Sequence, residues 1–269
     1  MGADEFAAGV GEFVQERPVS CQIHGRTLAA LFAGIHGKKI GFRVAVCSVG
    51  GVVRPWSQQL IHFMDFEGSL GSGILEYGVV TFQAGVILET RTRLCRATGA
   101  VRAEDIAVHG IDPRSVEARP PFTDDFDFFA GLRQSGPLAA HFSSAENTLI
   151  KAAWPYPRTS SDFSRDGGAV TDWGPWIDTG RLYPQFYPSL ASARLEELIG
   201  AFGMQAALEA AADRWCPPDR RHYHAALYDA LAGALLLTRL ETEPAVRDRS
   251  LGWLLAHSTL DPEKRDALN

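Results

Sequence analysis

Cysteine is scarce in this chain of 269 residues, and long apolar runs are missing from it. The four cysteines are far apart and form no C-x-x-C pair: Cys21, Cys47, Cys95 and Cys216. This spacing argues against a disulfide framework or a zinc knuckle and is typical of the reducing cytosol. No apolar run approaches the roughly 18–20 residues of a membrane span. We therefore expect a cytoplasmic protein without a membrane partner.

A surplus of basic residues is also missing. The formal net charge is −6, whereas proteins that bind nucleic acid usually present a basic surface. This balance does not exclude a nucleic-acid enzyme, because a bound metal ion supplies positive charge of its own. The first residues contain Asp4 and Glu5 and no basic stretch, so we expect no secretory signal.

Internal repeats and low-complexity tracts are absent, and the chain is divided only by a change of pattern. Residues 1–60 hold 9 of the 26 glycines, carry a net charge of +2 and have weak periodicity. We expect an N-terminal extension whose degree of order the sequence leaves open, with a helix near 26–33 and a strand over 40–49. The pattern sharpens at Ile61 and predicts one domain over 61–258, followed by a C-terminal tail over 259–269.

Within that domain, hairpin strands come first, and strands then alternate with helices. The predicted strands cover residues 61–66, 75–82, 85–96 and 137–142. The predicted helices cover residues 123–135, 143–154, 189–204, 224–240 and 245–257. Thr123 is the expected N-cap of the first of these helices. Such an order predicts an α/β fold with a mixed sheet and helices on both faces.

Two carboxylates lie in the first predicted strand, in MDFEGSL. Residues i and i+2 of a strand share a face, so Asp65 and Glu67 project side by side, roughly 7 Å apart at the backbone. Unpaired, they would repel, and one would be forced to take a proton. A divalent cation removes this conflict, and hard oxygen ligands suit Mg²⁺ or Mn²⁺. Alone, the pair also fits a solvent-exposed strand end or an ion pair with arginine.

Two later segments carry residues of similar chemistry. In RRHYHAALYDALAGALLL, His224 and Asp229 can face one site if His224 lies in the loop or first turn before the helix. In GPLAAHFSSAENTLI, a short strand delivers His141, and Glu146 follows five residues later in the first turns of a helix. Each segment taken alone also fits residues on a solvated surface.

The order of these segments resembles the DnaQ-like 3′–5′ exonucleases of the DEDDh type, over about residues 61–240. The three motifs of that family are matched by MDFEGSL, AAHFSSAEN and HAALYDA. VHGI, residues 108–111, stands where the family often has a His-Gly-Ile or Thr-Gly-Ile turn. Residues 177–204 are similar to the family's Asp-Thr, Leu-x-x-Leu and Phe-Gly segment.

The resemblance implies an RNase H-like fold, with a mixed five-stranded sheet whose first three strands are antiparallel. It also implies two divalent metal ions, Mg²⁺ or Mn²⁺, held by Asp65, Glu67, Glu146 and Asp229. His224 would be the general base that takes a proton from the attacking water. The partner would be the 3′ end of a single-stranded nucleic acid, DNA or RNA, and the product a nucleoside 5′-monophosphate. A polymerase or another protein partner, and the oligomeric state, are left open.

Five further residues are candidates for contact with the terminal nucleotide: Gly68, Ser69, Leu70, His109 and His141. The glycines of GSLGSG allow the backbone to approach a substrate closely. For His141 a structural role at a strand end is the competing interpretation. Trp154, Trp173 and Trp176 are expected to pack in the core more than to stack on bases.

Two residues depart from the family's second motif. Phe142 stands where the family usually has asparagine, and Glu146 where it usually has aspartate. Glutamate still offers a carboxylate to a metal ion, although it is one methylene longer. The alternative hypothesis is therefore a catalytically weakened nucleic-acid-binding or partner-binding module of the same fold.

Overall fold

The computed structural model describes residues 22–23, 26–27, 55–165 and 167–268. The chain divides into two compact units, residues 1–50 and 51–269.

In the first unit the described residues form a short antiparallel pair, β1 (Gln22–Ile23) and β2 (Arg26–Thr27). The prediction of a helix near 26–33 is therefore wrong at Arg26 and Thr27, which form a strand. The strand predicted over 40–49 lies outside the described residues.

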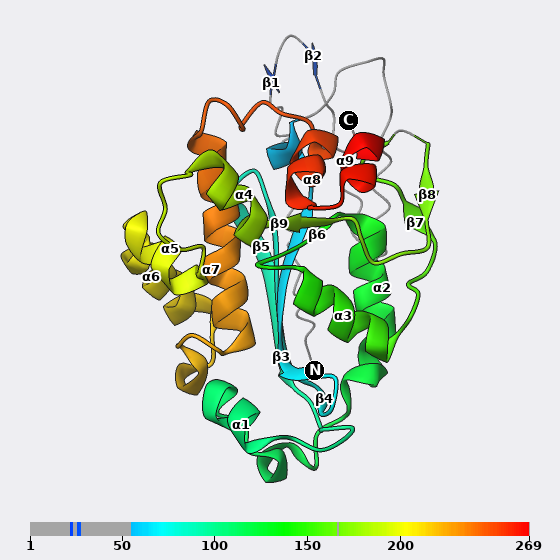
Figure 1. Cartoon of the computed structure of the whole chain (residues 1–269), viewed down its shortest axis with the longest axis vertical. Helices are drawn as coiled ribbons and strands as arrows, with labels where there is room; N and C mark the ends of the chain where they lie inside the picture. Colours follow the sequence, from blue (N-terminus) through cyan, green and yellow to red (C-terminus); the bar gives the residue numbers. More distant parts are fainter. Residues whose placement is uncertain (1–21, 24–25, 28–54, 166, 269) are drawn as a thin grey trace, which may run out of the picture. The chain divides into compact units, whose positions relative to one another are not determined.

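The second unit is built on a mixed five-stranded sheet (Figure 1). The strands lie in the order β5-β4-β3-β6-β9. The three that come first along the chain pair antiparallel, whereas β6 runs parallel to β3 and β9 runs parallel to β6. The bounds are β3 (Ile61–Ser69), β4 (Gly73–Gln83), β5 (Val86–Leu94), β6 (Leu138–Ala140) and β9 (Trp176–Asp178). The expected RNase H-like α/β fold is thus confirmed.

Helices cover both faces of this sheet, with α7 on one side and α2 and α3 on the other (Figure 1). The helices near the sheet are α1 (Ala103–His109), α2 (Phe126–Ser135), α3 (Ser144–Ala153), α4 (Thr179–Phe186), α5 (Leu195–Ala201), α6 (Gln205–Trp215) and α7 (Ala226–Arg239). The C-terminal helices are α8 (Leu251–Ser258) and α9 (Pro262–Leu268). In the part of the chain that the structure describes, none of the helices combines the length and hydrophobicity needed to cross a lipid bilayer.

Several helix boundaries differ from the sequence prediction. Thr123 is not an N-cap, because a 3₁₀ turn over Phe122–Asp125 precedes α2. The helix predicted over 189–204 begins at Leu195, and the C-terminal helix begins at Leu251. The helices α1, α4, α6 and α9 were not predicted. Isolated helices of this length are marginal in water, and α4 and α6 are stabilised by packing on the unit's core.

The long connection over residues 155–176 contains a small hairpin of β7 (Ser160–Ser161) and β8 (Ala169–Val170). The tryptophans at its ends pack inward: Trp173 is fully buried, and Trp154 lies 4.5 Å from the ring of Phe122 between centroids. The expectation that the tryptophans pack in the core is confirmed.

The side chains of β3 alternate between the two faces of the sheet. Phe63 joins the core cluster on the α7 side, whereas Met64 joins the cluster on the side of α2 and α3. Because the alternation has a period of two, Asp65 and Glu67 continue the row of Phe63 toward α7. The strand thereby presents both carboxylates to the start of that helix.

The start of α7 lies directly on β4 at Gly78. A Cβ atom at this position would lie 2.3 Å from the carbonyl carbon and oxygen of Ala226 and from the nitrogen of Leu227. Only a residue without a side chain allows the helix backbone to come this close. Gly78 is also the cross-strand partner of Asp65, so this contact brings the first turn of α7 beside that carboxylate.

We predict that Gly78→Ala lowers the free energy of unfolding by about 1–3 kcal/mol or more, because the backbone of α7 has to move away from the sheet. Gly131→Ala is the matched control, since Gly131 lies inside α2 with no atom within 4 Å of its added Cβ. The control is expected to be stabilising by about 0.5–1 kcal/mol. Urea unfolding of both variants gives the two values, and equal stabilities would contradict the close contact.

Candidate active site

The four carboxylates that the resemblance implies as metal ligands come from three elements of the second unit. Asp65 and Glu67 lie on β3, Glu146 lies in the first turn of α3, and Asp229 lies in the first turn of α7. Glu67, Glu146 and Asp229 are less than 10% exposed, at 9%, 5% and 7%. The charges of these three all raise the pKa of Asp65, so the four groups form one electrostatic cluster.

His224 lies on the exposed side of this cluster, in the loop immediately before α7. Its backbone is left-handed, with φ +63°, and its N–H donates a hydrogen bond of 2.9 Å to Asp229 Oδ2. Among the described residues, a ring nitrogen of His224 and one carboxylate oxygen each of Glu67 and Asp229 lie within 4.8 Å of one another. This is the loop position that the five-residue spacing of His224 and Asp229 requires.

Burial and mutual repulsion raise the pKa values of the clustered carboxyl groups. Burial raises the pKa of Glu67 and of Glu146 to about 8 and that of Asp229 to about 7. The pKa of Asp65 is also raised well above its ordinary value, first by burial and then by the charge of Asp229. Folding therefore collects negative charge that is unfavourable without a cation or bound protons.

Two oxygens of the cluster are buried without a hydrogen-bond partner among the described residues, Glu146 Oε2 and Asp229 Oδ1. Buried acceptors in folded proteins are normally hydrogen-bonded, so each exception needs an explanation. Hard anionic oxygens without protein partners are suitable ligands for Mg²⁺ or Mn²⁺. The residues present therefore fit the divalent cations that the resemblance implies.

A fifth buried carboxylate, Glu76, lies beside the cluster and was not among the predicted site residues. It stands on β4 opposite Glu67, and it is 2% exposed. Unlike the other four, it is fully paired: it forms an ion pair with Arg220 and accepts a hydrogen bond of 3.1 Å from the backbone N–H of Ala226. A glutamate inside the apolar strand LEYGVVTF was the only signal for it in the sequence.

Three of the five predicted nucleotide contacts lie at the turn between β3 and β4. Gly68 has φ +138°, and a Cβ there would lie 2.2 Å from the carbonyl oxygen of Gly73. Ser69 and Ser72 share a hydrogen bond of 3.1 Å between their hydroxyls. Leu70 is 67% exposed at the tip. The turn is therefore fixed by its own bonds and presents an apolar side chain to solvent.

The two predicted histidine contacts differ in their surroundings. His109 is buried at the end of α1, where its Nδ1 accepts a hydrogen bond from the backbone of Ile111 and its Nε2 has no partner among the described residues. His141 has both ring nitrogens within hydrogen-bond distance of protein oxygens, at 2.9 Å from the Thr179 hydroxyl and 2.8 Å from the Ala193 carbonyl. This geometry favours the structural interpretation of His141.

Asp178 was not predicted as a site residue, yet it fixes the turn that leads to Glu146. Its carboxylate accepts hydrogen bonds of 3.0 Å from the backbone N–H groups of Phe142 and Ser143. It also accepts from the N–H of Arg181 and so caps α4. Phe142 has a left-handed backbone, with φ +58°, and these bonds hold it there. The sequence carried a signal in the Asp-Thr pair of the family's supporting segment.

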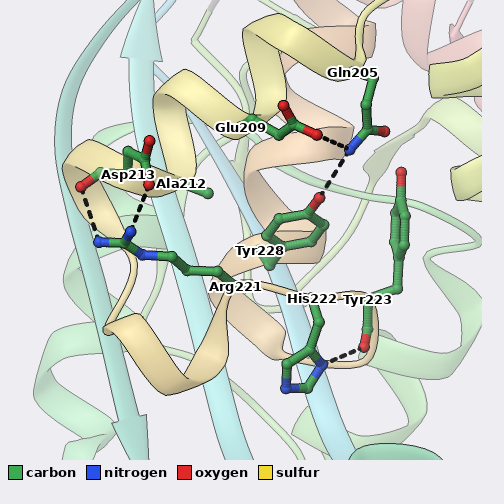
Figure 2. Close-up of a pocket in the computed structure, with 8 residues that line it drawn as sticks. All are labelled: Gln205, Glu209, Ala212, Asp213, Arg221, His222, Tyr223 and Tyr228. Carbon is green, nitrogen blue, oxygen red and sulfur yellow. Dashed lines mark hydrogen bonds and ion pairs between the residues drawn. The ribbon is translucent and has the colours of Figure 1, made fainter.

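A pocket of about 360 Å³ lies beside the loop that carries His224 (Figure 2). It is lined by Gln205, Glu209, Ala212, Asp213, Arg221, His222, Tyr223 and Tyr228. Arg221 forms an ion pair with Asp213 across its edge, and Tyr223 meets Tyr228 edge to face at 5.1 Å. None of the four clustered carboxylates lines it. The ion pair ties the loop to α6, and the ring contact ties it to α7.

Several solved structures similar to this chain are exonucleases. Exonuclease X in complex with 5′-overhanging duplex DNA matches with a TM-score of 0.51 and 20% identity over 70% of this chain and 96% of that chain. This chain shares the fold of the DnaQ-like 3′–5′ exonucleases. A 3′-exonuclease that recognises a histone mRNA stem-loop has a TM-score of 0.52 and 15% identity over 70% of this chain and 84% of that chain.

Escherichia coli exonuclease I with a dT13 oligonucleotide matches with a TM-score of 0.58 and 15% identity. The match covers 78% of this chain and 46% of that chain, so this chain corresponds to less than half of exonuclease I. A zinc-bound form of an exonuclease I complex with single-stranded DNA also matches, with a TM-score of 0.52 and 15% identity over 71% of this chain and 42% of that chain. No family model and no curated protein sequence matches the chain. At these identities the likeness shows the fold, and the chemistry has to be argued from the residues of this chain.

We predict that the metal-free protein loses stability as the pH rises from about 5 to about 8. The reason is that Glu67, Glu146 and Asp229 hold protons in the folded state that they have already released in the unfolded state. Millimolar Mg²⁺ or Mn²⁺ should suppress this loss, because a bound cation favours the ionised groups. The measurement is the melting temperature against pH, with and without EDTA.

The loss should amount to several degrees, given that 1 kcal/mol shifts the melting temperature of a domain of this size by roughly 2–4 °C. Asp229→Asn should flatten the metal-free curve, whereas Asn in place of the exposed Asp124 should leave it unchanged. A metal-free melting temperature that stays level or rises over this range would contradict the prediction.

Proposed function

We propose that this protein is a metal-dependent 3′–5′ exonuclease that hydrolyses the terminal phosphodiester bond of single-stranded DNA or RNA. The observation that carries the proposal is the cluster of Asp65, Glu67, Glu146 and Asp229 with the exposed His224 beside it. The shared fold supports it independently. Three of the similar structures contain DNA, and a fourth concerns recognition of a histone mRNA stem-loop, so the proposed substrate class covers both nucleic acids.

In this proposal the four carboxylates would hold two divalent cations, Mg²⁺ or Mn²⁺. When bound, the cations would supply the positive charge that stabilises the phosphoryl oxygens in the transition state. The carboxylates keep this charge in one place because three backbone elements fix them. Their own repulsion makes the metal-free cluster unfavourable, which provides a driving force for cation binding.

His224 would act as the general base. One of its ring nitrogens takes a proton from the attacking water while the water oxygen bonds to phosphorus. The bond between phosphorus and the 3′ oxygen of the penultimate nucleotide breaks, and its electron pair stays on that oxygen. The product is a nucleoside 5′-monophosphate. The exposure of His224 lets the proton pass on to solvent, and the hydrogen bond from its backbone to Asp229 keeps the base beside the carboxylates.

The turn of Gly68, Ser69 and Leu70 is the proposed floor for the terminal nucleotide. It directly follows Glu67 on β3, and its exposed leucine offers an apolar surface to a base. His109, which ends α1, is the other proposed contact, with its unpartnered Nε2 as the donor, because Nδ1 already accepts from the backbone of Ile111.

The competing function is a nucleic-acid-binding module of the same fold with weakened catalysis. Phe142 in place of the family's asparagine favours it, because a ring that packs against Gly180 cannot replace an amide. The two functions differ in one measurable outcome. The module would bind a single strand and leave it intact in Mg²⁺ and in Mn²⁺.

The first test is release of mononucleotides from a 3′-labelled single strand in Mg²⁺ or Mn²⁺, followed by EDTA. His224→Ala should lower kcat about 10²–10⁴-fold, the range for loss of a general base. His222→Ala is the matched control, since His222 is exposed on the same loop and outside the cluster. Intact substrate with folded wild-type protein would exclude the exonuclease. Equal rates for the two histidine variants would exclude His224 as the base.

A second prediction concerns Glu146, which departs from the family's aspartate. Glu146→Gln should remove metal-dependent activity by at least about 10²-fold, because the amide cannot supply the anionic oxygen. Glu146→Asp should retain more activity than Glu146→Gln, since it keeps the charge. The measurement is kcat as a function of Mn²⁺ concentration for both variants. A Gln variant that works as well as the Asp variant would remove Glu146 from the ligand set.

A further inference from the structure

Arg220 is a half-buried cation beside the cluster, and it joins three separate segments. Its Nε donates a 3.1 Å hydrogen bond to Glu76 Oε1, and its Nη2 completes the ion pair with Glu76 Oε2. Its Nη1 donates a 3.0 Å bond to the carbonyl of His109, and its Nη2 a 3.2 Å bond to the carbonyl of His224. The arginine and glutamate side chains are 12% and 3% exposed. One guanidinium thus ties β4, the end of α1 and the loop before α7 together.

The main chain of His224 is held on both sides by this arrangement. Its N–H donates to Asp229, and its carbonyl accepts from Arg220. The residue itself is exposed and has a left-handed backbone, a conformation that a non-glycine residue keeps only when its surroundings fix it. Neither ring nitrogen of His224 has a hydrogen bond among the described residues, so the hydrogen bonds that restrain this residue are those of its backbone.

The planar shape of the Arg220 guanidinium matters more than its charge for holding the carbonyl of His224. A guanidinium is planar and donates from several nitrogens at fixed angles, so it can hold Glu76 and two carbonyls at once. A lysine ammonium would keep the charge next to Glu76, but its single nitrogen could not reach the same three groups. A comparison of arginine with lysine at position 220 therefore separates a positioning effect from an electrostatic one.

We infer that Arg220, anchored by Glu76, is a positioning residue that holds His224 where it can take the proton of the attacking water. The inference rests on the proposed exonuclease function. The ion pair of Arg220 and Glu76 would then fix the geometry of a catalytic residue in addition to neutralising a buried carboxylate. A pair of this kind often contributes little to stability compared with well-packed apolar residues, and it can be retained for the geometry that it specifies.

The test is a double-mutant cycle between Arg220→Lys and His224→Ala, measured as kcat and KM for mononucleotide release. With His224 present, Arg220→Lys should lower kcat about 10²-fold, the cost of a misplaced catalytic group of roughly 1 Å, with KM changed less than threefold. With His224→Ala, the same substitution should change kcat less than threefold. Equal losses in both backgrounds, or no loss in either, would overturn the inference.

Arg221→Lys is the matched control, because Arg221 is the next residue on the loop and pairs with Asp213. Its kcat should stay within twofold of wild type. The pair Glu76→Gln with Arg220→Met removes both charges, and it covers the case in which Arg220→Lys does not fold. If this folded double variant kept wild-type kcat, Arg220 would not be a positioning residue.

A readout without catalysis separates this inference from the proposed function. In the metal-free protein, the imidazole NMR signals of His224 should shift or broaden in Arg220→Lys and stay unchanged in Arg221→Lys. If wild-type protein releases no mononucleotide, the exonuclease proposal fails while the NMR result still reports the contact. If wild type is active and the His224 signals do not respond to Arg220→Lys, the positioning role fails alone.

Discussion

The contact between the start of α7 and Gly78 of β4 is the constraint on which the site depends. Asp229 lies in the first turn of α7, and the cross-strand partner of Gly78 is Asp65. A side chain at Gly78 would push the helix away by contact with its own backbone. A second close contact, between Gly233 and the ring of Phe63, holds the same helix two turns later. The carboxylates of β3 and α7 can share a site because two glycines let the helix lie on the sheet.

The arrangement of charge follows from this packing. Four carboxylates are brought together with raised pKa values and two unpartnered oxygens, while a fifth, Glu76, is neutralised by Arg220. The four clustered carboxylates and Glu76 thus differ in the source of the cation that can neutralise them. A structural carboxylate in a protein interior is paired with a cation of the protein itself, as Glu76 is. Carboxylates left unpaired at the end of a buried strand are suited to a cation from outside.

The sequence was sufficient for the parts of this site that depend on local geometry. Strand alternation placed Asp65 and Glu67 on one face, and the spacing of His224 and Asp229 allowed a shared site on condition that His224 lies before the helix. The pairing of Glu76 with Arg220 could not be predicted, because 144 residues separate them and neither position has a local pattern. The late start of α5 and the added helix α6 were missed for a similar reason: both helices pack on α7, and such long-range contacts leave no local pattern in the sequence.

The departures in the second motif can be judged from how the segment is held. Phe142 is accommodated because its ring lies against Gly180, where a Cβ would be 2.6 Å from it. Asp178 binds the backbone of Phe142 and Ser143, so the turn is fixed without any amide side chain at residue 142. The following helix then presents Glu146 with its Oε2 buried and unpartnered. The backbone that delivers the carboxylate is thus supported by Asp178 at the end of β9 and by Gly180 in α4. Glu146 therefore keeps the fixed position that a metal ligand needs, although its side chain is one methylene longer than aspartate. A protein that no longer binds metal would gain nothing from a buried carboxylate oxygen without a partner, because such an oxygen costs stability.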